Sequence, residues 1–220
     1  MKLYCLFILA LLLACDVAAK PIRIVCIGDS LTACGGSGGH FTDHLTSWLP
    51  GAEIINKGIG GDTLAGGRAR YEKDVLLLQP DVVVIELGAN DFWQAKRPID
   101  DLAADLEYMI STARASNAQV VIASCFGDVE QGDSSPEFIE DLHSRYACEI
   151  ARFERRLVTQ YGCFYVPNMQ LDIKPAKEHP EFWSDNNHPN KAGNERVARR
   201  ILAELQKALT AAAMTSLSGM

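Results

Sequence analysis

Four short polar stretches carry the residue types that acyl transfer needs, and each borders an apolar segment. A serine hydroxyl becomes a nucleophile only when a base accepts its proton, and the tetrahedral intermediate needs hydrogen-bond donors for its oxyanion. Together the four stretches contain a serine, a histidine, carboxylates and glycines, so they are candidates for one acyl-transfer site. They are Gly28–Thr32 (GDSLT), Asn56–Thr63 (NKGIGGDT), Leu87–Asp91 (LGAND) and Ser184–Gly193 (SDNNHPNKAG).

Ser30 is the candidate nucleophile, because it follows the apolar run Ile22–Ile27 at a predicted strand-to-helix turn. A serine at such a turn exposes its hydroxyl, and the first amides of the following helix face the charge that develops during attack. Serine is also a preferred helix N-cap residue, and considered by itself Ser30 fits that simpler role better. The nucleophile assignment therefore depends on the other stretches.

His188 is the candidate base among five histidines. Asp185 stands three residues before it, in a turn that Pro189 restrains. A carboxylate in that place folds back onto the imidazole and holds its tautomer, as a triad with the chain order Ser, Asp, His requires. A turn carboxylate beside a surface histidine is the alternative for this D-x-x-H pattern alone. The other histidines are His40, His44, His143 and His179.

Donors for the oxyanion are expected from Gly60, Asn90 and the backbone amide of Ser30. Gly60 permits an unusual backbone conformation and a close approach, so its amide can point into the crevice. Asn90 adds a side-chain amide at the end of the next predicted strand. A flexible GIGG turn and a capped GAND loop are the alternatives for these two stretches.

The sequence predicts neither a metal nor a cofactor. The glycines of Gly35–Gly39 lack the following lysine and Ser/Thr of a phosphate-binding loop, and the dinucleotide-binding spacing is absent. His40 and His44 share a helix face at metal-ligand spacing. Phe41 occupies the place of a zincin's glutamate, however, and no strong third ligand follows nearby.

Apolar and β-branched runs alternate with helical patterns, which predicts an α/β fold. Such alternation implies crossover connections and hence a mostly parallel sheet covered on both faces, with its ligand crevice beyond the carboxyl ends of the strands. All four polar stretches lie where that crevice is expected. The predicted strands are Ile22–Ile27, Ala52–Asn56, Asp81–Leu87, Gln119–Cys125 and Cys163–Val166, and the predicted helices are His40–Leu49, Leu64–Leu78, Ile99–Ser116, Pro136–Tyr161 and Asn190–Ala211.

The composition predicts one domain without a nucleic-acid surface. The 220 residues are 48% hydrophobic and 22% charged, which is enough for one buried α/β core, and the formal net charge is -7. Arginines within 152–156 and 196–200 recur at helical spacing among carboxylates, as on solvated helix faces. We expect the domain to cover 20–213, with a disordered tail at 214–220, and to bind small molecules as a monomer.

Residues 1–19 have the three regions of an export signal. Lys2 precedes the apolar stretch Leu3–Ala14, which is too short to span a membrane, and small residues lead up to Ala19. Cleavage after Ala19 gives a free secreted or periplasmic protein, which is the form we favour. The alternative is lipidation of Cys15, because LLAC resembles a bacterial lipoprotein box, and an anchor there holds the domain close to the membrane.

Five of the seven cysteines lie beyond the predicted signal. Cys26, Cys125 and Cys163 fall in predicted strands, where a free cysteine behaves as a small hydrophobic residue. A domain of this size needs no disulfides for stability, so we expect these three to be free thiols. The pairing of Cys34 and Cys148 is left open. Because five is an odd number of cysteines, at least one thiol stays unpaired.

These motifs match, in order and spacing, the blocks of the SGNH hydrolases, also called GDSL-type esterases and lipases. The stretch Gly60–Asp91 is most similar to the bacterial thioesterase, arylesterase and lysophospholipase branch of that family. The resemblance covers essentially all of the chain beyond the signal. It implies a three-layer α/β/α sandwich with a flavodoxin-like five-stranded parallel sheet. The matching segments are Gly28-Asp29-Ser30-Leu31, Gly60, Gly88-Ala89-Asn90-Asp91 and Asp185-Asn186-Asn187-His188-Pro189.

The resemblance also implies roles for the candidate residues. Ser30 corresponds to the nucleophile, His188 to the base and Asp185 to the carboxylate that orients the base. Gly60 and Asn90 correspond to oxyanion-hole residues, beside the amide of Ser30. The mechanism implied is metal-free and needs no cofactor.

The predicted function is hydrolysis of a carboxylic ester or thioester through an acyl-enzyme. Acyl or aryl esters, thioesters and lysophospholipids are the expected substrates, a small-molecule or lipid-like class. Phe92 and Trp93, with the loops 126–136 and 169–183, are expected to border the acyl pocket. Two alternatives are a carbohydrate O-acetyl esterase that uses the same residues and a non-catalytic binding protein on the same fold.

Overall fold

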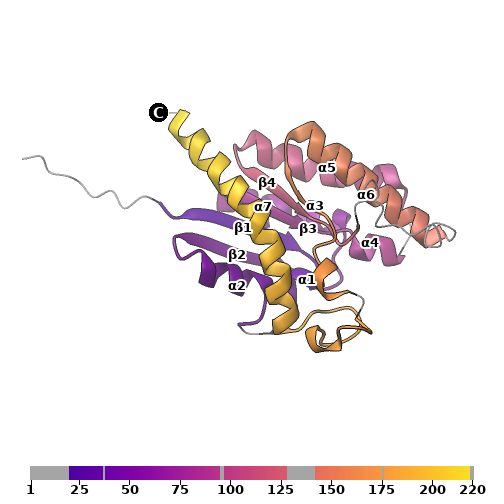
Figure 1. The fold of residues 1–220 in the computed structure, drawn as a ribbon. Helices are drawn as coiled ribbons and strands as arrows, with labels where there is room; N and C mark the ends of the chain where they lie inside the picture. Colours follow the sequence, from indigo (N-terminus) through magenta and orange to yellow (C-terminus); the bar gives the residue numbers. More distant parts are fainter. Residues whose placement is uncertain (1–19, 37, 95–96, 128–141, 175, 219–220) are drawn as a thin grey trace, which may run out of the picture.

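The computed structural model describes residues 20–36, 38–94, 97–127, 142–174 and 176–218. Its centre is one sheet of five parallel strands in the order β2-β1-β3-β4-β5 (Figure 1). This is the flavodoxin-like order, so the predicted sheet is confirmed. The strands are β1 (Ile22–Gly28), β2 (Ala52–Gly58), β3 (Val82–Glu86), β4 (Gln119–Ala123) and β5 (Phe164–Val166).

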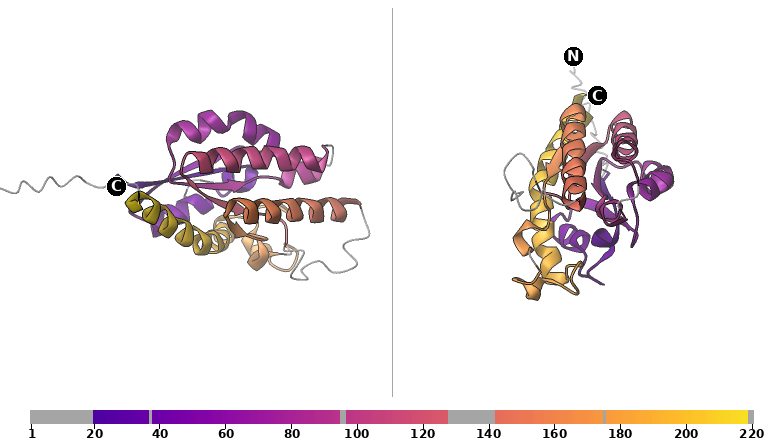
Figure 2. Two further views of the ribbon diagram at one scale, coloured as in Figure 1. Left: turned by 90° about the horizontal axis from the view of Figure 1, so that it is seen from above. Right: turned by 90° about the vertical axis from the view of Figure 1, so that its right-hand side faces the viewer.

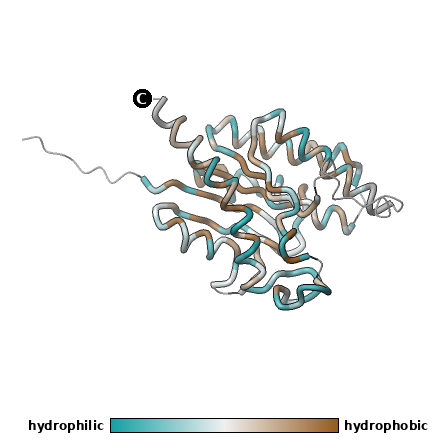
Figure 3. Tube along the Cα trace, viewed as in Figure 1, coloured by the Kyte–Doolittle hydropathy of each residue, from teal (hydrophilic) through white to brown (hydrophobic). Residues whose placement is uncertain are grey.

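The central strands are apolar because both of their faces are covered. Every residue of β3 and of β4 is buried, and hydrophobic residues follow the strands through the sheet (Figure 3). Along β1, Ile24 and Cys26 pack into one apolar cluster, whereas Val25 and Ile27 pack into the other. Neighbouring side chains of a strand point to opposite faces, so a single strand supports both halves of the core.

Helices cover the two faces of the sheet and complete the predicted three-layer sandwich (Figure 2). Helices α3, α5 and α6 pack on the face of Val25 and Ile27, and helices α2 and α7 pack on the opposite face. All strands run in parallel, so their carboxyl ends meet at one edge of the sheet. The helices are α2 (Phe41–Trp48), α3 (Leu64–Asp74), α5 (Ile99–Ala115), α6 (Leu142–Tyr161) and α7 (Lys191–Ser218).

Two short helices at the carboxyl edge were not predicted. They are α1 (Ser30–Ala33), directly after β1, and α4 (Ala89–Gln94), which follows β3. Helices of four and six residues are too short to show a hydrophobic period in the sequence. They carry Ser30 and Asn90, so the two least predictable helices are the ones that hold candidate site residues.

Other boundaries differ from the predicted ones at helix ends. The helix predicted over Leu64–Leu78 divides into α3 and a 3-10 turn, η1 (Leu76–Leu78), and two further turns, η4 (Leu171–Ile173) and η5 (Pro180–Phe182), precede α7. Helix α7 continues to Ser218, so residues 214–218 of the expected tail are helical. The predicted export signal with Cys15, the start of the helix predicted from Pro136 and residues 219–220 lie outside the described residues.

The five cysteines beyond the predicted signal are free, so the expectation for Cys26, Cys125 and Cys163 is confirmed. Burial raises the pKa of Cys26 to about 12, which makes that thiol unreactive. Within the described ranges, no helix is both long enough and apolar enough to cross a membrane.

Candidate active site

The nucleophile turn begins where β1 ends. Asp29 is the N-cap of α1, because its Oδ1 accepts a hydrogen bond from the amide of Leu31 at 2.8 Å. Ser30 is therefore the first residue of the helix, and the simpler interpretation of Ser30 as an N-cap is wrong. Amides in the first turn have no acceptor inside the helix, so the Ser30 amide needs one from outside it.

Gly28 leaves room for two buried side chains beneath this turn. A Cβ on Gly28 would lie 2.7 Å from the carbonyl oxygen and from Oε2 of Glu86, and it would overlap Oγ1 of Thr32. Thr32 and Glu86 are fully buried and have no space to withdraw. The packing of these two side chains therefore requires the glycine of the GDSL sequence.

Ser30, His188 and Asp185 form one hydrogen-bonded chain. Oγ of Ser30 lies 3.0 Å from Nε2 of His188, and Nδ1 of the same ring lies 2.8 Å from Oδ2 of Asp185. The serine and the histidine are 158 positions apart in the sequence, so the fold alone joins them. The ring nitrogen lies within the distance that proton transfer from the hydroxyl needs.

The Asp185 carboxylate also closes its own turn. Its Oδ1 accepts the amides of Asn187 and His188, both at 2.8 Å. These bonds, together with the one to the His188 ring, lower the pKa of Asp185 to about 2, although the carboxylate is largely exposed. Asp185 is therefore ionised at neutral pH and directed at the imidazole.

Asn190, at the start of α7, holds the histidine turn in place. Its Oδ1 accepts the amide of Ala192 at 2.9 Å as a helix cap, and its Nδ2 donates to the carbonyl of Glu181 at 2.8 Å. The amide of Ser184 donates to the carbonyl of His188 at 2.8 Å. Hydrogen bonds within the loop that carries His188, and between that loop and the start of α7, thus hold the histidine in place.

Asn90 lies on the wall of the site. Its Nδ2 donates to Oδ2 of Asp29 at 3.0 Å and to the carbonyl of Asp62 at 2.8 Å. Both amide hydrogens are used in this way, so an oxyanion has to share or replace one of the two acceptors. These bonds join the second and third polar stretches to the nucleophile turn.

Gly60 lies in a loop that hydrogen bonds hold against the site on both sides of the glycine. The amide of Ile59 donates to the carbonyl of Gly28 at 3.0 Å, and the carbonyl of Asp62 accepts the side-chain amide described above. The left-handed backbone conformation is at Gly61, with φ of 79°, so the expectation of an unusual conformation at Gly60 is wrong by one residue. A Cβ on Gly60 would meet no atom within 4 Å.

A cavity of about 530 Å³ opens beside Ser30, and Phe92 and Trp93 line it. The Phe92 ring makes edge contacts with Trp93, at 5.1 Å between centroids, and with Phe126, at 5.7 Å. Trp93 is 65% exposed, so this series of rings leads from the surface into the cavity. It forms an apolar wall next to the candidate nucleophile.

Helix α6 forms one wall of the cavity, and this wall was not predicted from the sequence. Ala147, Cys148 and Ala151 line the cavity, and their spacing on one face of the helix was the available signal. Small residues on a helix face are equally typical of close helix packing, so the pattern alone does not indicate a cavity. The remaining lining residues are Leu31, Ala89, Cys125, Gly127, Asn168, Gln170, Leu171, Lys174, Trp183, Asn186 and Asn187. Residues 128–136 of the predicted border lie outside the described residues.

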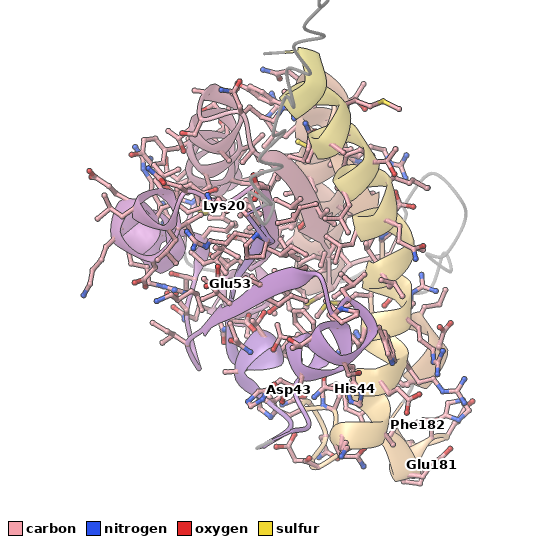
Figure 4. The ribbon with its side chains drawn as sticks, turned by 90° about the vertical axis from the view of Figure 1, so that its left-hand side faces the viewer. Lys20, Asp43, His44, Glu53, Glu181 and Phe182 are labelled. Carbon is pink, nitrogen blue, oxygen red and sulfur yellow. The ribbon has the colours of Figure 1, made fainter. Side chains whose placement is uncertain are left out.

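The histidines considered as metal ligands have other partners. Nδ1 of His40 lies 2.7 Å from Oδ2 of Asp43, and Nε2 of His44 lies 3.2 Å from the carbonyl of Lys191. Figure 4 shows Asp43 and His44 on α2, close to the start of α7. Across the described ranges, no group of three or more metal-ligating side chains comes together.

A serine, a histidine and a carboxylate in one hydrogen-bonded chain, at the carboxyl edge of a flavodoxin-like sheet, are the arrangement of a serine hydrolase. The family model of the GDSL-like Lipase/Acylhydrolase family matches residues 26–196. The chain belongs to that family and is a GDSL-type hydrolase.

Individual relatives agree with this membership. An arylesterase from Vibrio mimicus is 30% identical over 199 residues, which cover 85% of this chain and 90% of that protein. An acetylxylan esterase from Geobacillus stearothermophilus is 26% identical over 210 residues, which cover 83% of this chain and 93% of that protein. The crystal structure of TesA has the same fold, with a TM-score of 0.71 at 24% identity, covering 84% of this chain and 99% of that one.

Proposed function

We propose that this hydrolase cleaves carboxylic esters or thioesters by forming an acyl-enzyme on Ser30. The observation that carries the proposal is the 3.0 Å contact between Oγ of Ser30 and Nε2 of His188, with Asp185 on the other side of the ring. A hydroxyl and an orienting carboxylate on opposite nitrogens of one imidazole are the geometry of general-base activation. Membership of the family supports the same chemistry.

In this mechanism His188 takes the proton of Ser30 as Oγ attacks the substrate carbonyl. The bond to the leaving oxygen or sulfur then breaks, and His188 returns the proton to that atom. Water attacks the acyl-enzyme by the same route, with His188 again as base, and the acid leaves as Ser30 regains its proton. Asp185 keeps the imidazole in the required tautomer and stabilises the imidazolium.

The oxyanion is proposed to bind the amides of Ser30 and Gly60 and the side chain of Asn90. The Ser30 amide is at the first position of α1, and Asn90 is tied to the cap residue of that helix. For Asn90 to donate, the oxyanion competes with the carbonyl of Asp62 for one amide hydrogen. A charged oxygen is a stronger acceptor than a neutral carbonyl, which favours the exchange during reaction.

Asn90→Ala tests this assignment. We expect kcat to fall by about 10²- to 10³-fold with a smaller change in KM, because one oxyanion donor is lost. Steady-state kinetics on a p-nitrophenyl ester measure the effect. Gln94→Ala, an exposed change on the same helix, is the matched control and should leave kcat unchanged. If Asn90→Ala keeps kcat within about threefold of the wild type, Asn90 is not an oxyanion donor.

The acyl part of the substrate is proposed to lie in the cavity beside Ser30. Phe92, Phe126 and the small residues of α6 offer it an apolar wall, which fits an acyl chain or an aryl group. A carbohydrate O-acetyl esterase is the second candidate, and the likeness to an acetylxylan esterase over 93% of that protein favours it. The two candidates use the same catalytic residues and differ in how much of the cavity the acyl group fills.

A chain-length series of p-nitrophenyl esters, from acetate to palmitate, separates the two candidates. Each buried methylene contributes about 0.8 kcal/mol, so butyrate should exceed acetate in kcat/KM by about tenfold if the cavity holds the acyl chain. A preference for acetate, together with release of acetate from acetylated xylan, instead identifies an O-acetyl esterase. Ala151→Leu, which fills the cavity wall, should lower kcat/KM for longer esters more than for acetate.

Export remains part of the proposal. The charged, apolar and small-residue regions of 1–19 support removal of that segment after Ala19, or lipidation at Cys15. Mass spectrometry of the protein from a bacterial host distinguishes a chain that begins at Lys20 from one that begins with a lipidated cysteine.

A further inference from the structure

Two acidic side chains are buried against each other directly beneath the nucleophile turn. Asp29 and Glu86 are both 0% exposed, although acidic residues are rarely buried to this degree without a cation. In the ranges that the structure describes, no ion pair joins either carboxyl to a lysine or an arginine. The catalytic mechanism proposed above gives neither of them a part.

Asp29 connects the two halves of the proposed catalytic machinery. Its Oδ1 accepts the amide of Leu31 at 2.8 Å, which sets the start of α1 and so the position of Ser30. Its Oδ2 accepts Nδ2 of Asn90 at 3.0 Å. One carboxylate thus aligns the nucleophile turn with the side chain proposed to hold the oxyanion, and an ionised carboxylate is the better acceptor for both donors.

Glu86 supports Asp29 from below, at the end of β3. Its Oε2 accepts hydrogen bonds from Oγ1 of Thr32 at 2.8 Å and from the amide of Asp29 at 3.3 Å. Its Oε1 lies 3.4 Å from Sγ of Cys125. The bond from the Asp29 amide to Glu86 places the two buried carboxyl groups next to each other. Two adjacent carboxylates that are buried without a cation repel each other, so we expect one proton on the pair.

We propose that Glu86 is a positioning residue that holds this proton and donates it in a hydrogen bond to Asp29. Asp29 thereby stays ionised and keeps Ser30 and Asn90 in place. The assignment of the proton to Glu86 follows from the partners: Asp29 receives one donor on each oxygen, whereas Glu86 receives its two closest donors on a single oxygen. The proton stays on the pair throughout the reaction. The role in catalysis rests on the function proposed above.

The pKa shifts of the pair agree with a shared proton. Burial raises the pKa of Asp29 to about 6, although its hydrogen bonds to Leu31 and Glu86 lower it. Burial and the neighbouring Asp29 charge raise the pKa of Glu86 well above its ordinary value. Among the residues described, Oε1 of Glu86 has only the weak thiol donor of Cys125, whereas each oxygen of Asp29 accepts an N–H donor.

The other charged and titratable groups around the pair do not reverse the order of the two pKa values, in which that of Glu86 is the higher. His188 lowers the pKa of Asp29, which favours its ionised form, and Asp62 opposes that effect while it pairs with Arg70 at 2.7 Å. Burial raises the pKa of Cys34 to about 11 and that of Cys125 well above its ordinary value, so both thiols are neutral. His188 thus favours the anion on Asp29, Asp62 disfavours it but has its own charge paired with Arg70, and the two thiols add no charge.

Glu86→Gln and Glu86→Met test the proposal through kinetics on a p-nitrophenyl ester. Glutamine is permanently neutral and still offers a donor to Asp29, so kcat should stay within about threefold of the wild type at pH 7. Methionine has a similar length but no donor, so kcat should fall by about 10²-fold with little change in KM, as for a displaced catalytic group. Glu154→Gln is the matched control, because Glu154 is also a buried carboxyl whose partner, Tyr165, lies 3.1 Å away and outside the proposed catalytic set.

A second measurement does not depend on activity. A raised pKa in the folded state means that folding takes up a proton, so wild-type stability falls as the pH rises from about 4.3, the usual pKa of an unfolded Glu. Glu86→Gln lacks this loss, so the free energy of unfolding of the variant should rise relative to the wild type between pH 4 and pH 9. Burial raises the pKa of Glu154 to about 7, so infrared spectra are compared in the Glu154→Gln background. At pH 7 that variant should show a protonated carboxyl band that is absent when Glu86→Gln is added.

The outcomes separate this proposal from the function it rests on. Retained kcat in Glu86→Gln, lost kcat in Glu86→Met and the expected trend of stability with pH support the proton on Glu86. Equal losses of kcat in both variants, or a stability difference that does not change with pH, overturn it. If the wild type hydrolyses no ester, the proposed function fails, whereas the infrared and stability measurements still decide where the proton is.

Discussion

Ser30→Ala should lower kcat for p-nitrophenyl esters by about 10⁵-fold or more, with the fold unchanged. The substitution removes only the hydroxyl group, so the ester bond between Oγ and the acyl group cannot form. The oxyanion donors and the cavity remain. Loss of a triad serine leaves only the residual acceleration that binding and the oxyanion hole provide. Steady-state kinetics, with circular dichroism and thermal unfolding of both proteins, measure the effect.

Ser47→Ala is the matched control for this experiment. Ser47 is an exposed serine on α2 whose hydroxyl donates to the carbonyl of His44 at 2.8 Å, away from the cavity. It should leave kcat within about twofold of the wild type. A burst of p-nitrophenol before steady state, present in the wild type and absent from Ser30→Ala, adds direct support for the acyl-enzyme. Equal activity of Ser30→Ala and the wild type would remove Ser30 from the mechanism.

Asp185→Asn has the second largest expected effect, a decrease in kcat of about 10³- to 10⁴-fold. An amide in place of the carboxylate favours the wrong tautomer of His188, so Nε2 carries a proton and does not accept the one from Ser30. The turn itself should persist, because the retained amide oxygen still accepts the backbone amides of Asn187 and His188. The expected loss is therefore in kcat, measured with unchanged secondary structure.

Asp43→Asn is the control for this second prediction. Asp43 pairs with Nδ1 of His40 at 2.7 Å, three residues away, so it repeats the Asp–His geometry without a contact to Ser30. Its substitution should leave kcat unchanged. The pKa of Asp185 is lowered to about 2, so the carboxylate is ionised throughout the range from pH 4 to pH 8. A loss of wild-type activity within that range therefore has to come from another group, and a step near pH 2 is the one that Asp185→Asn should abolish.

Local sequence was enough to predict the five strands and most of the helices. Apolar runs such as the first four residues of β3 (VVVI) are required by burial on both faces, and periodic stretches such as Ile99–Ala115 are long enough to show their period. The short helices that hold Ser30 and Asn90 have no such signal. Their helical form depends on the Asp29 cap and on contacts with neighbouring loops.

The sequence by itself also determined which residue types could form the site and in what order along the chain. The alternation of elements implies crossover connections and parallel strands, so the polar stretches with Gly28, Gly60, Asn90 and His188 are expected at one edge of the sheet. Side-chain direction and local backbone conformation do not follow in the same way. Both depend on packing between segments that are far apart in the sequence, and the left-handed backbone conformation lies at Gly61 and not at Gly60.

Only the tertiary structure therefore decided the distances on which the chemistry depends. The 3.0 Å contact of Ser30 with His188 spans 158 positions, and the contact of Asp29 with Glu86 spans 57. Local sequence does not identify the cavity wall on α6 or the buried acid pair, because each exists only when separate elements pack together. Residue identity and element order are local properties that a sequence records, whereas burial, hydrogen-bond geometry and the resulting protonation states arise only once the layers are assembled.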